Sequence, residues 1–205
     1  MTLRNLKCAQ FLPVLAATLV LSGLLSGGIF TIPAANARPA AAECPAPPVA
    51  LKNFKPAEKN SAPVAAAFQD AEGNPVTVAE AARKRGVVIN FWATWCAPCI
   101  KEMPELDALK KTLAADGIDV IALSQDRGGL AKVAPFFKKQ GYANLDIHLD
   151  PKSAFGRAYK IRGLPTTIIF DRDGRELGRL EGIAEWNATE VVDFIRACLP
   201  AQSGE

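Results

Sequence analysis

Two cysteines separated by two residues are the feature of this sequence best suited to chemistry. Residues 91–99 read FWATWCAPC, so Cys96 and Cys99 follow an apolar run that ends at Trp92. Where a strand leads into a helix, the first cysteine lies at the helix N-terminus, whose unpaired N–H groups and macrodipole favour a thiolate. Because a thiolate attacks disulfides, the pattern indicates dithiol–disulfide exchange, with Cys96 as nucleophile and Cys99 as resolving thiol.

A structural zinc site is the main alternative for a Cys-x-x-C pair. Such a site needs further ligands at a matching spacing. The chain has a single histidine, His148, and no second Cys-x-x-C pair. His148 falls on an expected strand, where we expect a structural role. The ligand count therefore predicts no bound metal, and no other cofactor is expected.

The N-terminal segment indicates export. Arg4 and Lys7 precede a stretch without charged residues from 8 to 35, and Ala35-Asn36-Ala37 is an A-x-A cleavage site. The stretch also exceeds the ~20 residues that span a bilayer, so residues 1–37 form either a cleaved signal peptide or an N-terminal membrane anchor. The basic residues keep the N-terminus cytoplasmic. We therefore expect the domain on the periplasmic side of the inner membrane, anchored or soluble.

Composition divides the rest of the chain into a tether and one domain. Residues 38–60 are rich in Ala and Pro, which is typical of an extended linker. Residues 61–200 are long enough for a single domain with its own core. The basic residues are scattered, and the formal net charge of the chain is only +3, which argues against a nucleic-acid partner. We expect a monomer.

Two further cysteines would face the same oxidising compartment as the redox pair. Cys44 lies in the expected tether, and Cys198 lies in the last expected helix. With Cys96 and Cys99 they make the even number that two disulfides need in an exported protein. Two interpretations remain open. Either Cys44 and Cys198 form a structural disulfide, or Cys198 is a buried free thiol and Cys44 belongs to a flexible tether.

The hydrophobic pattern predicts an α/β fold with a mixed sheet and helices on both faces. Two short apolar runs within 66–78 surround Glu-Gly-Asn-Pro and predict a hairpin. Apolar positions recur at intervals of three and four residues from 98 to 115, which predicts a helix that begins at the cysteine pair. The other expected elements are strands at 87–92, 118–124, 145–149, 166–170 and 175–182, and helices at 130–140, 153–159 and 186–199, the last capped by Asn187.

This order of motifs resembles the thioredoxin fold and, more narrowly, the TlpA/ResA-like thiol:disulfide interchange proteins, which are related to the AhpC/TSA and Redoxin proteins. The resemblance spans about residues 60–199. It rests on the export signal, the front hairpin, VVINFWATWCAPC, the Glu-Met-Pro that begins at Glu102, an inserted β-α unit near 143–159, and GLPTT at 163–167. It implies a thioredoxin-like fold with a mixed central sheet, an N-terminal β-hairpin and the inserted β-α unit.

The resemblance also implies roles for residues around the pair. Pro165 is expected to be cis, to pack beside the disulfide and to leave the backbone of Leu164 free to pair with an extended substrate. Trp95 is expected on the substrate-facing rim, and Trp92 in the core. Glu102 either tunes the pair and assists proton transfer, or is a solvent-facing helix carboxylate without a role.

Asn90 departs from the cytosolic thioredoxins, which have a buried Asp six residues before the first cysteine. A side-chain amide cannot accept a proton in this way, so a proton relay cannot use this position. The departure favours Glu102, or a water molecule, in that role.

The resemblance implies an enzyme that reduces cysteine pairs in exported client proteins and is recharged by a membrane thiol carrier. Its clients would be assembly factors of metal centres or cytochromes, including apocytochrome c and copper chaperones of cytochrome oxidase. A disulfide-forming oxidant is an alternative, because the reduction potential decides the direction. A copper-binding assembly chaperone on the same fold is another. That chaperone would need a wider cysteine spacing and a distal histidine, for which His148 is the only candidate.

Overall fold

The computed structural model describes residues 44–58 and 62–201. The predicted signal peptide or anchor at 1–37 lies outside the described residues. Within the described part of the chain, no helix combines the length and the apolar character that crossing a membrane requires.

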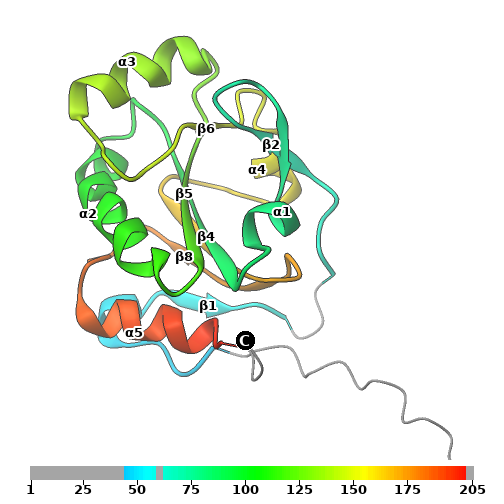
Figure 1. The fold of residues 1–205 in the computed structure, drawn as a ribbon, viewed down its shortest axis with the longest axis vertical. Helices are drawn as coiled ribbons and strands as arrows, with labels where there is room; N and C mark the ends of the chain where they lie inside the picture. Colours follow the sequence, from blue (N-terminus) through cyan, green and yellow to red (C-terminus); the bar gives the residue numbers. More distant parts are fainter. Residues whose placement is uncertain (1–43, 59–61, 202–205) are drawn as a thin grey trace, which may run out of the picture. The chain divides into compact units, whose positions relative to one another are not determined.

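A mixed sheet of eight strands lies at the centre of the described residues, in the order β1-β8-β7-β4-β5-β6-β2-β3 (Figure 1). Its central strand β4 (Gly86–Trp92) is parallel to β5 (Ile118–Ser124) and antiparallel to β7 (Thr166–Asp171). Every residue of β4 is buried, as expected for a strand that is covered on both faces. The other strands are β1 (Phe54–Pro56), β2 (Ala67–Gln69), β3 (Pro75–Thr77), β6 (His148–Leu149) and β8 (Glu176–Glu181).

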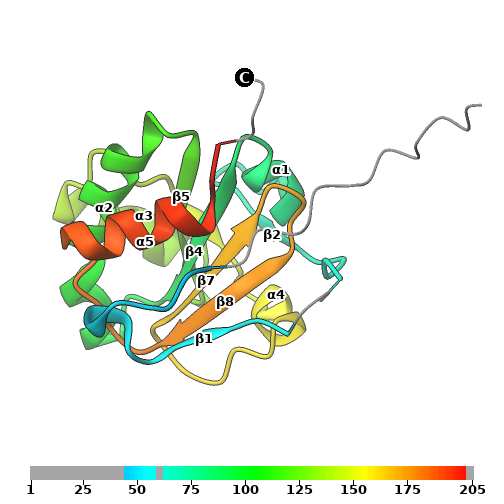
Figure 2. The same ribbon diagram turned by 90° about the horizontal axis from the view of Figure 1, so that it is seen from below.

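Helices cover both faces of the sheet, as predicted (Figures 1 and 2). Alternate residues of β4 point to opposite faces, so that Val88 joins one core cluster while Val87 and Ile89 join the other. The first face is covered by α2 (Ala97–Ala114), α3 (Leu130–Gln140) and α5 (Thr189–Cys198), and the second by α1 (Val78–Ala82) and α4 (Ala154–Ala158).

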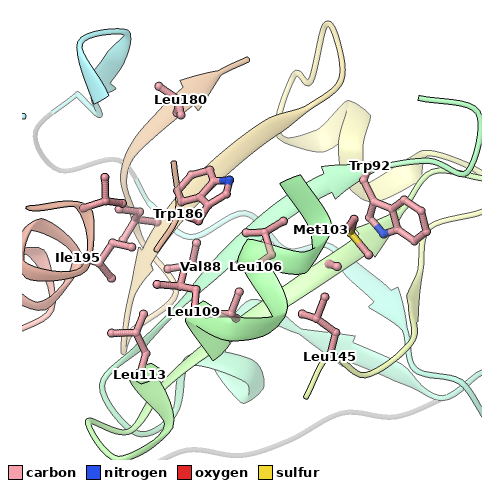
Figure 3. Close-up of a cluster of buried hydrophobic side chains, with 14 of the residues drawn as sticks. Val88, Trp92, Met103, Leu106, Leu109, Leu113, Leu145, Leu180, Trp186 and Ile195 are labelled. Carbon is pink, nitrogen blue, oxygen red and sulfur yellow. The ribbon is translucent and has the colours of Figure 1, made fainter. Parts of the chain in front are cut away.

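The larger core cluster holds α2 against the sheet (Figure 3). Leu106 and Leu109 of α2 lie in this cluster with Val88 of β4 and Ile195 of α5. Trp186, which precedes α5, belongs to the same cluster and is 2% exposed. Each large apolar side chain buried in this way contributes about 1.5–3 kcal/mol. Apolar packing therefore holds the helix that carries the cysteine pair against the sheet.

The segment 38–60, predicted as a tether, is partly built into the domain. A 3₁₀ turn, η1 (Val49–Leu51), precedes β1, and β1 pairs antiparallel with β8 at the sheet edge. Leu51 is 2% exposed and Phe54 is 6% exposed, with the Phe54 ring edge-on to Phe194 of α5. The tether prediction is therefore wrong for these residues. Burial of the Leu51 and Phe54 side chains stabilises the segment on the domain, although its Ala- and Pro-rich composition is typical of a linker. The domain begins before residue 61.

Three smaller differences from the prediction concern one additional helix and the ends of two predicted elements. The helix α1 was not predicted; it starts at a capping box in which Thr77 and Glu80 satisfy each other's backbone N–H groups. The strand predicted at 145–149 is reduced to β6. The predicted cap at Asn187 is wrong, because α5 begins later, with Ala188 as N-cap, and the carboxylate of Glu190 accepts a hydrogen bond from Ala50 N–H at 3.3 Å.

Cys44 and Cys198 form a disulfide, although they are 154 residues apart in the sequence. Cys198 is fully buried at the end of α5, and Cys44 packs against the same core cluster. The bond joins the first described residue to the last helix.

Replacing both Cys44 and Cys198 with alanine should lower the free energy of unfolding by roughly 2–5 kcal/mol, because the bond restricts the unfolded chain over a long loop. Denaturant unfolding of the oxidised proteins measures the loss. The matched control is Cys96→Ala with Cys99→Ala, which removes a bond between residues only 3 apart and should cost less. Equal losses in the two double variants would contradict the loop-closure explanation.

Candidate active site

The cysteine pair lies where β4 ends and α2 begins. Cys96 and Cys99 form a disulfide, and Cys96 is the N-cap residue of α2. The Cys96 Sγ accepts a hydrogen bond from Cys99 N–H at 3.3 Å. Pro98 lies in the first turn, where its missing N–H breaks no helical hydrogen bond. In the reduced pair, a thiolate at Cys96 would be stabilised by the positive end of the helix macrodipole.

Both cysteines are buried, Cys99 more completely than Cys96. Cys96 is 5% exposed, and Cys99, one turn further along α2, is fully buried. Trp95, immediately before the pair, is 70% exposed. Trp92 is fully buried and its ring packs on Phe136 of α3, so the core role predicted for Trp92 is confirmed.

Asp126 holds the loop that leads into Cys96. This residue follows β5 and is 4% exposed. Its carboxylate accepts hydrogen bonds from Thr94 N–H at 2.8 Å, from the Thr94 hydroxyl at 2.6 Å and from the Ser124 hydroxyl at 2.9 Å. These three donors replace the water that burial removes, and they fix the loop between β4 and α2. Asp126 was not predicted as a site residue from the sequence.

Glu102 lies one helical turn from Cys99 and is 3% exposed. Its Oε1 accepts a hydrogen bond from Asn90 Nδ2 at 2.8 Å, and its Oε2 accepts one from Trp186 Nε1 at 2.9 Å. Ala184 N–H adds a third, longer bond at 3.4 Å. The alternative of a solvent-facing carboxylate is therefore wrong, because α2 points Glu102 into the protein between β4 and the loop before α5. Trp186 was not predicted as a partner.

Burial raises the pKa of Glu102 above its ordinary value, because the ionised carboxylate loses its water. The hydrogen bonds from Trp186 and Asn90 stabilise the ionised form and oppose this rise, while the nearby carboxylate of Glu105 adds to it. Desolvation is the largest of these effects, so Glu102 keeps its proton to higher pH than an exposed glutamate does.

Asn90 connects Glu102 to the strand that follows the proline. Its Nδ2 also donates to Thr167 Oγ1 at 3.0 Å, and the register of β4 and β7 places these two residues opposite each other. The peptide bond between Leu164 and Pro165 is cis. Within the described part of the chain, neither the N–H nor the C=O of Leu164 makes a backbone hydrogen bond. The start of β7 therefore lies beside the end of β4, next to the cysteine pair.

Trp95 and Leu164 line one groove of about 720 Å³, together with the loop after β5 and part of α4. The groove brings together an exposed aromatic side chain and an unpaired backbone at the edge of the cysteine pair. An extended peptide could contact both, because an unpaired backbone segment can form main-chain hydrogen bonds with an added strand.

His148 lies on β6 with its ring against Phe68, at a centroid distance of 5.5 Å. Burial lowers the pKa of His148, and the nearby charge of Lys110 lowers it further. Across the described residues, no three His, Cys, Asp or Glu side chains are grouped as a metal site would need.

Comparisons with known proteins agree with this geometry. A family model described as Redoxin matches residues 54–190. The thiol-disulfide oxidoreductase ResA of Bacillus thuringiensis subsp. konkukian (strain 97-27) is 30% identical over 131 residues, which cover 64% of this chain and 73% of that protein. ResA of Bacillus subtilis (strain 168) is 32% identical over 136 residues, which cover 66% of this chain and 73% of that protein.

Solved structures support the fold. A thiol:disulfide interchange protein of the thioredoxin family from Chlorobium tepidum TLS has a TM-score of 0.52 at 24% identity, covering 69% of this chain and 99% of its own. StoA from Bacillus subtilis has a TM-score of 0.51 at 19% identity, covering 63% of this chain and 94% of its own. The predicted thioredoxin-like fold is confirmed.

Glu102→Gln should remove a pH dependence of stability. The native state holds the Glu102 proton to higher pH than the unfolded chain, whose ordinary pKa is 4.5. Native stability therefore falls as the pH rises from that value through the raised native pKa, since the unfolded state binds fewer protons there. The variant does not titrate at this position, so its stability relative to the wild type should increase over that interval and be constant below it.

Denaturant unfolding at a series of pH values from about pH 4 upward measures this difference. Glu185→Gln is the matched control, because Glu185 is exposed on the loop beside Ala184. If the free energies of unfolding of the Glu102 variant and the wild type differ by the same amount at every pH, the prediction is wrong.

Proposed function

The chain belongs to the Redoxin family and is a protein thiol–disulfide oxidoreductase, and from this premise we propose that it reduces disulfides in exported client proteins. One observation carries the proposal: Cys96 caps the N-terminus of α2, with Cys99 buried one turn behind it. This arrangement supports a division of roles, in which Cys96, at the start of the helix, attacks the client and Cys99, fully buried, resolves the mixed disulfide.

The exchange proceeds in two steps. In the reduced enzyme, the Cys96 thiolate attacks one sulfur of the client disulfide; a bond forms between Cys96 and the client, and the second client sulfur leaves as a thiolate that takes up a proton. Cys99, deprotonated, then attacks Cys96 Sγ. This attack closes the Cys96–Cys99 disulfide, releases the first client sulfur, and completes the transfer of two electrons to the client.

Glu102 assists proton transfer in the second step, in which Cys99 must lose its proton before it attacks. A buried carboxyl group whose pKa is raised exchanges protons closer to neutral pH than an exposed one, which suits general acid–base work. Asn90 and Trp186 act as positioning residues, because they hold the two carboxylate oxygens from different elements.

The client lies across the groove beside the pair. The free backbone of Leu164, next to the cis bond of Pro165, pairs with an extended client segment, and the exposed ring of Trp95 contacts it from the other side. Backbone pairing holds the segment without requiring a particular sequence.

The enzyme acts on the periplasmic side of the inner membrane, anchored or released, and a membrane thiol carrier recharges it. Support comes from Arg4 and Lys7 before the uncharged stretch of 8–35, and from the disulfide between Cys44 and Cys198, a type of bond that persists in oxidising compartments. The resemblance to TlpA/ResA-like proteins supports clients in the assembly of cytochrome c or cytochrome oxidase.

Reduced Cys99→Ser protein should accumulate mixed disulfides with its clients in an extract of exported proteins, because the resolving thiol is gone. Non-reducing electrophoresis, before and after reductant, measures these adducts. Cys96→Ser is the control and should form none. An oxidant's clients would be dithiols, with which the reduced variant cannot react. If the wild type reduces disulfides but the Cys99→Ser protein forms no adducts, the roles of Cys96 as nucleophile and Cys99 as resolving thiol are wrong.

Glu102→Gln should shift the titration of the cysteine pair and slow disulfide exchange near neutral pH, because the variant can neither take up nor supply the proton. The alkylation rate of the reduced proteins as a function of pH measures the shift, with exchange rates measured in parallel. Glu185→Gln should match the wild type. Curves for the Glu102 variant that superpose on those of the wild type would remove Glu102 from the mechanism.

A further inference from the structure

The groove between Trp95 and Leu164 carries an excess of positive charge. Its ionisable lining residues are the basic Arg127, Lys132, Arg157 and Arg162 and the acidic Asp126. Asp126 is 4% exposed, and its oxygens already accept hydrogen bonds from Thr94 and Ser124. The accessible charge in the groove is therefore basic.

Among the described residues, three of these four basic side chains have no acidic partner and are available to a ligand. All four are exposed. Within the described part of the chain, Arg127, Lys132 and Arg157 form no ion pair, and Arg157 donates only to the backbone oxygen of Lys152. Arg162 forms an ion pair with Glu181, with 2.9 Å between Nη2 and Oε1, and Lys55 pairs with the other oxygen of the same carboxylate. Like charges gathered around one groove raise the local concentration of anions.

A second groove, beside the redox helix α2, has the opposite balance of charge. This groove, of about 630 Å³, reaches Pro98 in the first turn of α2. Its accessible ionisable lining residues are Glu105, Glu185 and Glu190 and a single base, Lys101; Glu102 also lines it but is 3% exposed. An excess of positive charge is thus found in the groove of Trp95 and Leu164 and not in this second groove.

We infer that the client segment bound by this site carries acidic side chains where it crosses the groove between Trp95 and Leu164. The inference rests on the proposed function and specifies its substrate class. Trp95 and the Leu164 backbone can hold any extended segment, whereas Arg127, Lys132 and Arg157, unpaired among the described residues, attract carboxylates and repel a basic segment. Exposed charges of this kind act mainly on association, so they affect kcat/KM and its dependence on salt.

Two synthetic peptides test the inference. Both contain the same internal disulfide; one has glutamates flanking the cysteines, and the other has glutamines at the same positions. For the reduced full-length protein, kcat/KM for the glutamate peptide should exceed that for the glutamine peptide roughly three- to tenfold at low ionic strength, the size expected of a few exposed ion pairs. The ratio should approach one at high salt, because salt screens exposed charges.

Variants test whether the preference for the glutamate peptide arises from this groove. In Arg127→Gln with Arg157→Gln, the ratio between the two peptides should fall towards one, whatever the absolute rates. The matched control is Lys138→Gln with Lys139→Gln, which removes the same charge from the exposed last turn of α3, outside both grooves. This control should keep the wild-type ratio. A ratio unchanged in the arginine variant would overturn the assignment to this groove.

A neutral substrate separates this inference from the proposed function. Hydroxyethyl disulfide is small and uncharged, so its reduction depends on the cysteine pair but not on groove charge. Equal kcat/KM for the two peptides, together with reduction of hydroxyethyl disulfide, would overturn the inference and leave the proposed function standing. Failure to reduce any of the three substrates would overturn the proposed function itself.

Discussion

A buried ionised carboxylate without hydrogen-bond donors costs several kcal/mol, and Glu102, one helical turn after Cys99, is buried. Its donors come from β4 and from the loop before α5, and both elements must stay in place for the carboxylate to be satisfied. Besides the apolar core, the side chain of Glu102 therefore links the redox helix, the central strand and the loop before α5. A shift of either partner element would reach Cys99, which is one helical turn away.

Asn90 suits a partner that changes its protonation state. Its amide carries a donor on one side and an acceptor on the other, so either end can face the carboxyl group. In the structure Nδ2 faces Glu102, and Oδ1 has no hydrogen-bond partner among the described residues. A protonated Glu102 could donate to that oxygen after the amide turns over. An aspartate at this position would instead place two carboxyl groups together, and their repulsion would hinder ionisation of both.

Local patterns predicted the parts of the site that are close in sequence. The apolar run of β4 and the helical spacing after Cys96 were sufficient to place the pair at a strand–helix junction. The contact between Trp186 and Glu102 joins residues 84 apart and depends on tertiary packing, which no local pattern encodes. The five-residue α1 is too short to show a helical period and is marked only by its capping box. In 38–60, the composition predicted a linker, but burial of Phe54 holds part of this segment against the domain.

The bond between Cys44 and Cys198 also determines how the domain bears mechanical load. The edge strand β1 has three residues and a single neighbour, so tension arriving along the chain before Cys44 would otherwise peel it from β8 one hydrogen bond at a time. With the bond in place, tension enters α5 at Cys198 instead, where the last turn of that helix, including Ile195, is buried in the core. The weakly held strand β1 is thereby relieved of tension that arrives along the chain before Cys44.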